Sequence, residues 1–165
     1  MFRKLFGKEK PTEEILKAPV NGKVVSLEDV PDPVFSQKMM GDGVAIEPKD
    51  GQVVSPVEGE VIQVFPTKHA IGLKGKTGIE ILIHIGLETV QMEGEGFETL
   101  VNQGDKVKVG DVLVRFDKNL IEEKATSSII PIVLTNGDII ESVDHFETAD
   151  AESGVTDLLK ITVKN

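Results

Sequence analysis

The chemistry of this chain is concentrated in two of its three histidines, His69 and His84, which lie in one stretch, residues 67–89. A neutral imidazole is nucleophilic and has an unperturbed pKa of about 6.5, so near pH 7 it can accept a phosphoryl group. Two close imidazoles repel when both are charged, which keeps at least one of them neutral. The alternative is that both are solvated surface side chains. His145 lies outside this stretch in acidic sequence, and we expect it to be exposed.

A β-hairpin is predicted to position the two histidines. From residue 79 to residue 85 the apolar residues alternate, so four isoleucines face the core and His84 faces away from it. A four-residue loop, Gly75–Gly78, would pair Lys74 with the first isoleucine. His69 would then lie opposite His84 on the same face, with Cβ atoms about 4.5–5.5 Å apart. A five-residue loop would shift the register by one residue and place the histidines on opposite faces, so we favour the four-residue loop.

Composition limits the classes of protein and of partner. The 165 residues fit one domain, which would bury about 70% of its unfolded surface. The net charge of −10 disfavours nucleic acid and favours partners with basic patches. The absence of cysteine excludes disulfides and thiol chemistry. No run approaches the roughly 20 apolar residues of a membrane span, and the N-terminus does not resemble a secretory signal, so we expect a cytoplasmic protein.

The first ten residues differ from the rest of the chain. Residues 1–10 carry four basic side chains and one acidic one, whereas the chain as a whole is acidic. Their apolar residues recur at helical spacing, which is compatible with weak contact with an anionic membrane. A solvated, frayed tail is the alternative. We therefore predict a flexible basic N-terminal tail, residues 1–14, followed by a single β-sandwich domain, residues 15–165.

Short strands separated by Gly, Pro and Asp clusters run from Ile15 onward, which predicts an all-β fold. A sequence echo, Pro19–Val24 and Pro56–Val61, repeats a proline, a turn glycine and a β-branched run. This repeat predicts two similar halves packed into an antiparallel, barrel-like β-sandwich. Helices are expected only as short interruptions.

Local signals predict where those interruptions and turns lie. Asp32 followed by Pro33 is typical of the start of a short helix, and Asn119 is predicted to cap a second one. Residues 107–113 are predicted to form strand, turn and strand. Asn136-Gly137 predicts a hairpin between two further strands.

Several segments resemble one known family. The segments T-K-H-A, G-I-E-I-L-I-H-I-G and T-V-Q-M-x-G-x-G-F, with V-K-V-G-D-V-L further on, are similar to the glucose-specific IIA components of the bacterial phosphoenolpyruvate-dependent sugar phosphotransferase system. The resemblance covers residues 15 to 150. It implies a phosphotransferase component that accepts a phosphoryl group from the histidine-containing phosphocarrier protein on His84. The group would then pass to a cysteine of a sugar permease IIB domain.

The resemblance also implies roles for individual side chains. His69 would stabilise the phosphoryl group, and Thr67 would hold His69 by a hydrogen bond, with no cofactor needed. An apolar collar and an acidic rim around the histidines would dock partner proteins, including regulatory targets of the kind that some relatives have. From the residues alone, burial in the core or plain solvation remain alternatives for each of them. The expected collar and rim residues are Val34, Phe35, Ile71, Leu82 and Val90, with Asp32 and Glu88.

Two other functions stay open. The histidine pair could bind zinc in a hydrolase, but a catalytic zinc normally needs three protein ligands, and neither H-x-H nor H-E-x-x-H occurs. The resemblance implies at most zinc that His69 and His84 share with a partner's carboxylate. Residues 55–59 and 107–111 echo biotinyl and lipoyl carrier domains. The triplets that hold the modified lysine there, M-K-M or D-K-A, are absent.

Overall fold

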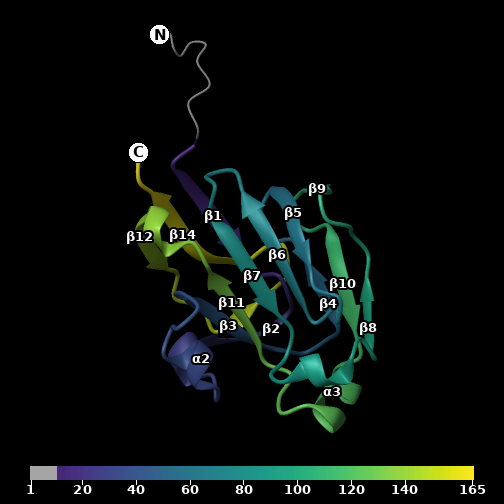
Figure 1. The fold of residues 1–165 in the computed structure, drawn as a ribbon. Coiled ribbons are helices and arrows are strands. Elements are labelled where there is room, and N and C mark those ends of the chain that lie inside the picture. The colour runs from purple at the N-terminus through teal and green to yellow at the C-terminus, as the bar shows by residue number, and fades with distance from the viewer. Residues whose placement is uncertain (1–10) are drawn as a thin grey trace.

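Antiparallel strands make up most of the described chain, which in this computed structural model is residues 11–165 (Figure 1). Residues 1–10 of the predicted tail lie outside the described residues. The strands are β1 (Glu13–Lys17), β2 (Gly22–Ser26), β3 (Gly43–Pro48), β4 (Gln52–Val54), β5 (Gly59–Val64), β6 (Ala70–Gly75), β7 (Glu80–His84), β8 (Phe97–Thr99), β9 (Lys106–Val107), β10 (Val112–Phe116), β11 (Ile130–Leu134), β12 (Ile140–His145), β13 (Asp150–Ala151) and β14 (Asp157–Val163). The helices are α2 (Pro33–Ser36) and α3 (Lys118–Lys124), with 3₁₀ turns η1 (Leu27–Asp29), η2 (Thr89–Met92) and η3 (Gly137–Ile139).

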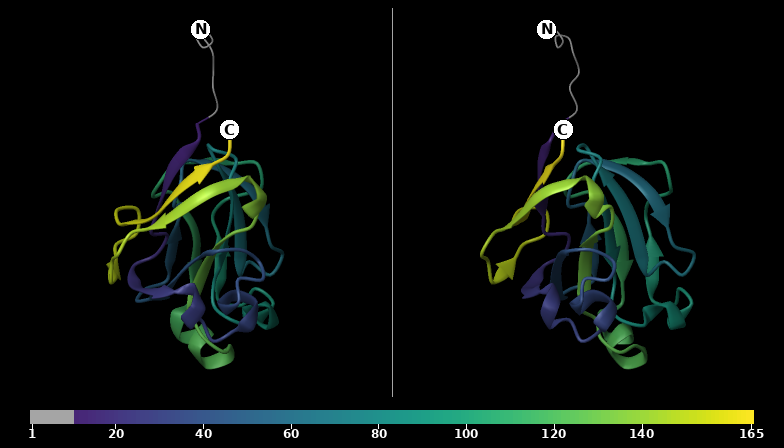
Figure 2. Two further views of the ribbon diagram at one scale, coloured as in Figure 1. Left: turned by 90° about the vertical axis from the view of Figure 1, so that its left-hand side faces the viewer. Right: turned by 60° about the vertical axis from the view of Figure 1, so that its left-hand side comes forward.

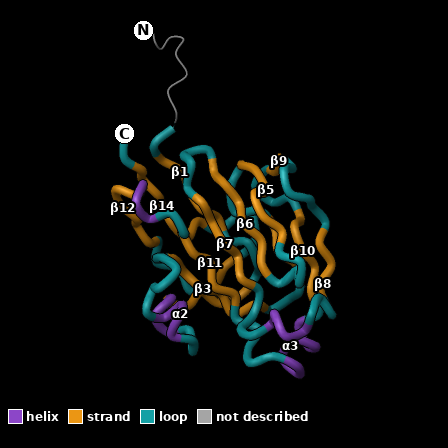
Figure 3. The backbone as a smooth tube through the Cα atoms, viewed as in Figure 1, coloured by secondary structure: helices purple, strands orange, loops and turns teal. Residues whose placement is uncertain are grey.

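These strands form three antiparallel sheets. The largest has the order β13-β2-β3-β11-β7-β6-β5-β9, and the smaller ones have the orders β1-β14-β12 and β4-β10-β8. Figure 2 shows the β1-β14-β12 sheet from its own side, with β12 and β14 next to each other. Both α-helices lie at the end of the sandwich where β7 ends, away from the two marked termini (Figures 1 and 3). The predicted antiparallel β-sandwich with only short helices is confirmed.

The two similar halves are visible in the largest sheet. β2 and β5, which carry the sequence echo, are each the second strand from an end of that sheet. Each begins at a glycine that meets the backbone of its partner strand. A Cβ on Gly22 would lie 2.0 Å from the Glu47 oxygen, and a Cβ on Gly59 would lie 2.1 Å from the Lys74 oxygen. The turn glycine of each half is therefore required for the same close approach between backbones.

Alternation along β7 separates the core from the histidine face. The isoleucines at alternate positions are buried in the main core, as predicted: Ile79, Ile81, Ile83 and Ile85. A smaller core beneath α2 contains Phe35, Leu87 and Val133. Because β7 lies between β11 and β6, both of its edges are hydrogen-bonded. The strand that ends in His84 is thus fixed on two edges and one face.

Of the two predicted helix caps, one is confirmed. Asp32 caps α2 by accepting a hydrogen bond from Val34 N at 3.0 Å, with proline at the first helical position. The cap predicted for α3 is wrong. Asp117 caps that helix by accepting from Leu120 N at 3.0 Å, and Asn119 lies inside the first turn. An aspartate two residues earlier supplies the same kind of acceptor, so the helix begins there.

The hairpin predicted at Asn136-Gly137 is also wrong. β11 pairs with β3 and β7, whereas β12 pairs with β14, so the chain crosses between sheets at this point. The Asn136 side chain accepts from Glu80 N at 2.8 Å and donates to Gly78 O at 3.0 Å, and so it braces the β6–β7 hairpin. The strands predicted within residues 107–113 are present as parts of β9 and β10.

The boundary predicted between tail and domain needs a small correction. β1 begins at Glu13, so the strand includes Glu13 and Glu14, the last two residues of the predicted tail. The Glu14 side chain is buried, and its carboxylate accepts hydrogen bonds from the Thr77 backbone and hydroxyl. Charged side chains are buried when they have such partners, which the sequence does not reveal.

Candidate functional site

The β6–β7 hairpin has a different register from the predicted one. Lys74 pairs with Glu80, so the loop has five residues and not four. His84 therefore lies opposite Ala70, and the predicted cross-strand pairing with His69 is wrong. The carbonyl of the last loop residue accepts from the first loop N–H at 2.9 Å, which closes the turn one residue later than expected. By ladder register alone, the two histidines would face opposite sides of the sheet.

His69 nevertheless reaches His84, because the chain leaves regular strand geometry just before β6. Lys68 has a left-handed backbone, with φ at 65°, and Phe65 N donates to Ala70 O at 3.2 Å to close a tight loop. The two imidazole rings lie with their centroids 4.9 Å apart, at an interplanar angle of 80°. The close pair expected from the sequence is therefore present, through a bent strand end.

Two phenylalanines enclose the pair. The Phe35 ring lies 5.2 Å from the His84 ring, and the Phe65 ring lies 5.6 Å from the His69 ring, measured between centroids. His69 is only 5% exposed, whereas His84 is half-buried and open to solvent on one side. The two phenyl rings form apolar walls, and the more accessible imidazole belongs to His84.

Each ring has its Nδ1 atom engaged. His84 Nδ1 lies 2.7 Å from the Gly86 carbonyl oxygen. Since a carbonyl only accepts, Nδ1 donates this hydrogen bond, and in the neutral ring the lone pair is on Nε2. His69 Nδ1 lies 2.6 Å from Thr67 Oγ1, so the hydrogen bond implied for these two residues is present.

The surroundings favour the neutral form of both rings. Burial, with a smaller contribution from the neighbouring His84, lowers the pKa of His69 from 6.5 to about 4. Burial also lowers the pKa of His84, while the hydrogen bond to Gly86 and the charge of Asp32 oppose that change. At neutral pH the site therefore presents uncharged imidazoles, which is the nucleophilic form.

The predicted collar is only partly accessible. Val34 and Val90 are 38% and 50% exposed, and Phe35 and Leu82 are buried. Phe35 takes part in the site through its contact with His84 rather than through exposed surface. The accessible apolar surface thus comes from α2 and η2, which flank the end of β7.

Ile71 does not belong to the collar. It is fully buried in the main core and pairs with Ile83. The reason is the register: the one-residue shift moves every side chain of β6 to the opposite face. The prediction that Ile71 belongs to the collar depends on the four-residue loop and is wrong for the same reason.

The two residues predicted to form an acidic rim lie at the starts of α2 and η2. Asp32 is half-buried at the start of α2, and its charge acts on His84. Glu88 is exposed just before η2, where it has a left-handed backbone at φ 62° and no capping hydrogen bond from its side chain. Its carboxylate is therefore free of a role in starting the turn.

Sequence reasoning missed several residues at this end of the molecule. Phe65 packs on His69, and Gly86 supplies the carbonyl that orients His84. Met39 and Met40, in the loop after α2, are 68% and 38% exposed and extend the apolar surface. A glycine two residues after a histidine at a strand end is a usable signal. The contact of Phe65 with His69 depends on the tight loop, which no local sequence pattern predicts.

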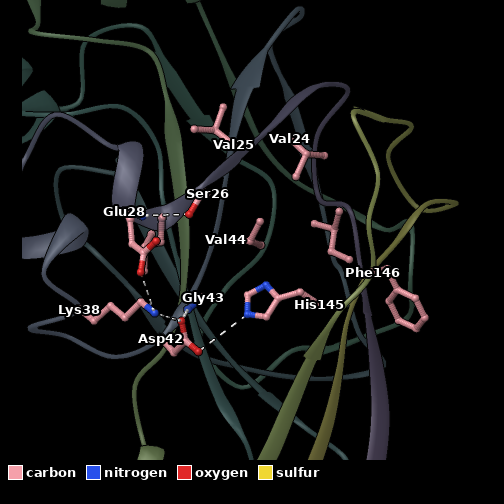
Figure 4. Close-up of a pocket in the computed structure, with 12 residues that line it drawn as sticks. Val24, Val25, Ser26, Glu28, Lys38, Asp42, Gly43, Val44, His145 and Phe146 are labelled. Carbon is pink, nitrogen blue, oxygen red and sulfur yellow. Dashed lines mark hydrogen bonds and ion pairs between the residues drawn. The ribbon is translucent and has the colours of Figure 1, made fainter.

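A separate hollow of about 300 Å³ lies beside β12, and His145 lines it without contacting the histidine pair (Figure 4). Asp42 lies 3.4 Å from the Lys38 ammonium and 3.8 Å from His145 Nε2, between the two side chains. His145 is exposed, as expected. Valines form much of the floor of this hollow, and its charged groups are paired with one another.

Within the part of the chain that the structure describes, no group of three or more His, Asp or Glu side chains is arranged to hold a metal ion. The histidine pair offers two nitrogen ligands, so a zinc ion would need further ligands from another molecule. Between residues 11 and 165, neither α-helix has the length and hydrophobicity that a bilayer span requires.

Comparisons with known proteins agree on one family. The model of the phosphoenolpyruvate-dependent sugar phosphotransferase system, EIIA 1, matches residues 14–140. A glucose-specific EIIA component of this system from Bacillus anthracis is 58% identical over 99% of this chain and 100% of its own length. One from Halalkalibacterium halodurans is 54% identical over 99% of both chains. The solved glucose permease IIA from Mycoplasma capricolum superimposes with a TM-score of 0.81 at 36% identity, covering 93% of this chain and 98% of that one.

Fold, site and matches together define a β-sandwich protein of the phosphoryl-transfer class. The chain belongs to the EIIA 1 family of the phosphoenolpyruvate-dependent sugar phosphotransferase system. It relays a phosphoryl group from the histidine-containing phosphocarrier protein to an EIIB domain, as the resemblance implied. The hydrolase and prosthetic-group carrier alternatives are thereby set aside.

Proposed function

We propose that His84 Nε2 is the atom that carries the phosphoryl group. The observation behind this proposal is the hydrogen bond from His84 Nδ1 to the Gly86 carbonyl, which leaves the lone pair on Nε2. In the first transfer, Nε2 attacks phosphorus, and the bond between phosphorus and the donor's histidine breaks. In the second, a cysteine thiolate of the EIIB domain attacks phosphorus, and the bond to Nε2 breaks, returning His84 to its neutral form.

In this mechanism His69 stabilises the phosphoryl group and Thr67 positions His69. Thr67 donates its hydroxyl proton to His69 Nδ1, so that Nε2 of His69 carries a proton directed at the phosphoryl oxygens. The 2.6 Å contact between Thr67 and His69, and the closeness of the two rings, support this assignment. The depressed pKa of His69 keeps that ring neutral, so that the ring acts as a hydrogen-bond donor rather than as a fixed cation.

Partners dock on the surface around the pair. Val34 and Val90 offer exposed apolar contacts, and Asp32 and Glu88 add negative charge that suits basic patches on a partner. We assign both the phosphocarrier protein and the EIIB domain to this surface, since each must reach His84. The EIIB domain is that of a glucose permease by analogy with the relatives named above, and the transfers take place in the cytoplasm without a cofactor.

The test is incubation with radiolabelled phosphoenolpyruvate, purified enzyme I and the phosphocarrier protein. Label that is lost in acid and kept in base indicates phosphohistidine, and we expect it on the native chain. His84→Ala should be unlabelled because the nucleophile is missing. His145→Ala is the matched control, since that exposed histidine lies outside the site, and it should be labelled as the native chain is. Label on His84→Ala would reject the assignment.

A further inference from the structure

We propose that Thr89 is a positioning residue for the reaction: it holds the turn after β7 so that the Gly86 carbonyl keeps the His84 proton on Nδ1. The inference rests on the proposed role of His84 and extends it to a residue that touches neither reacting atom. Thr89 is fully buried at the start of η2. Its hydroxyl donates to the Ile85 carbonyl at 2.6 Å.

The methyl group of Thr89 acts on the next residue of the same turn. Gly86 has φ at 79°, and a Cβ there would lie 2.6 Å from Thr89 Cγ2 and 2.9 Å from the Ser127 carbonyl oxygen. Glycine is thus required both by the backbone conformation and by the closeness of Thr89. One buried side chain therefore contacts both residues of the turn, its hydroxyl binding Ile85 and its methyl group facing Gly86.

Two peptide groups meet at Gly86, and both are anchored. The peptide between Gly86 and Leu87 is held by Leu87 N, which donates to Ser127 O at 2.9 Å. The peptide between Ile85 and Gly86 is held by the Thr89 hydroxyl. Since glycine has wide backbone freedom, the Gly86 carbonyl keeps its direction only when both neighbouring peptides are fixed. Of these two anchors, the one on the Ile85–Gly86 peptide comes from a side chain, that of Thr89.

This direction matters for the chemistry of His84. When Nε2 bonds to phosphorus, the ring gains positive charge, and its Nδ1–H donates a charge-assisted hydrogen bond to Gly86 O. If the carbonyl turns away, the ring is free to carry its proton on Nε2, which then has no lone pair for attack. Thr89 therefore acts through Gly86 on the fraction of His84 in the reactive tautomer.

The experiment compares Thr89→Val, which removes the hydroxyl and keeps the shape, with Thr89→Ser, which keeps the hydroxyl. Ring ¹⁵N chemical shifts of His84 in the unphosphorylated proteins report the tautomer, and transfer from the phosphocarrier protein gives kcat and KM. We expect Thr89→Val to move His84 toward the Nε2–H tautomer and to lower kcat about tenfold, the effect of losing one buried hydrogen bond, with KM within twofold. Thr89→Ser should restore both.

Thr77→Val is the matched control. Thr77 is equally buried and also donates its hydroxyl, to Glu14, at the far end of the same hairpin. A tautomer shift of the same size in Thr77→Val would mean a general loss of stability and would overturn the proposal. So would native ¹⁵N shifts in Thr89→Val, or shifted tautomers with unchanged kcat. Because the shifts are measured without phosphate, they test Thr89 even where labelling shows another acceptor, which would reject the role of His84 instead.

Discussion

The two imidazoles of the site differ in what their Nδ1 atoms touch. His84 is bound to a carbonyl, which can only accept, whereas His69 is bound to a hydroxyl, which can donate. The two rings can therefore act differently on a group held in the space between them. A nucleophile needs a free lone pair, and a stabilising group needs a proton to donate. We infer that this difference in partners, more than the spacing of the histidines, underlies the separate roles proposed for them.

That difference predicts an asymmetry between two substitutions. His69→Gln should still be labelled by the phosphocarrier protein, because the nucleophile remains. Transfer onward to the EIIB cysteine should be slower by about 10²–10³-fold, the usual cost of losing a positioned group that stabilises transferring charge. The measurement is single-turnover transfer from the labelled chain to purified EIIB domain. Label on His84→Gln but none on His69→Gln would reverse the two roles.

The lowered pKa of His69 predicts a pH dependence of stability. Its pKa is about 4 in the folded chain and about 6.5 when unfolded, so the unfolded chain takes up the proton first as the pH falls. The contribution of His69 is present above pH 6.5 and is lost progressively down to pH 4, by up to about 3 kcal/mol. Denaturant unfolding of the native chain and of His69→Gln at several pH values measures it. Parallel stability curves for the two proteins would contradict the assignment.

At the scale of elements, the site depends on one regular strand and on the irregular connection before β6. β7 ends at His84, and the tight loop before β6 places His69 beside it. The four non-glycine residues with positive φ in the described chain all lie in connecting segments and not in strands: Lys38, Lys68, Glu88 and Glu93. Such conformations cost of order 1 kcal/mol each and persist where the surrounding structure determines them.

The repeated glycine at the start of β2 and β5 predicts a stability effect far from the site. Gly59→Ala should destabilise the fold by more than about 2 kcal/mol, because its Cβ would lie 2.1 Å from a backbone oxygen that cannot move alone. Gly137→Ala is the control, since a Cβ there meets nothing within 4 Å, and its effect should be about 0.5 kcal/mol or less. Urea unfolding compares the two. Equal stabilities would show that the strands can separate to admit the methyl group.

The strands that the sequence could predict are those whose side chains alternate. The isoleucines of β7 identify its core face directly, because burial repeats with the period of the strand. Turns were less predictable. Gly75 and Gly78 lie within both a four-residue and a five-residue loop, and the choice depends on Asn136, which braces the hairpin from a distant part of the chain. The same limit applies to Phe65, whose contact with His69 depends on a left-handed residue between them.

At the scale of the whole molecule, charge and active site are distributed differently. The chain carries a net charge of −10, while residues 1–10 carry an excess of basic side chains. The acidic body suits the basic patches that we assign to partners, and the basic segment suits an anionic membrane. Transfer and membrane contact would then be functions of separate parts of the chain.

Deletion of residues 1–10 tests this separation. Transfer to a soluble EIIB domain should be unchanged, because the deleted segment precedes every residue of the site. Binding to vesicles that contain anionic lipid should weaken, because four basic side chains and Phe2, Leu5 and Phe6 are removed together. Sedimentation with vesicles measures it. Equal binding by both forms would support a tail that does not touch membranes.

The cofactor-free mechanism makes its own prediction. Once the magnesium-dependent enzyme I has been removed, transfer from purified, labelled phosphocarrier protein to this chain should continue in excess chelator. The chemistry then depends on positioning and on neutral imidazoles alone. Gel-resolved transfer with and without chelator is the measurement. Arrest by chelator, reversed by added zinc, would show that the histidine pair acts with a metal.

The position of the two chain ends has a consequence for how such a domain is deployed. Thr12 and Val163 are joined by a backbone hydrogen bond of 2.8 Å, and both ends of the fold emerge away from the end where β7 stops (Figure 1). Another polypeptide could therefore be joined to either terminus without covering His84. A permease that carried this domain on a flexible tether would gain a millimolar local supply of phosphoryl donor. Both chain ends thus lie at one end of the sandwich, and the end of β7, which carries His84, lies at the other.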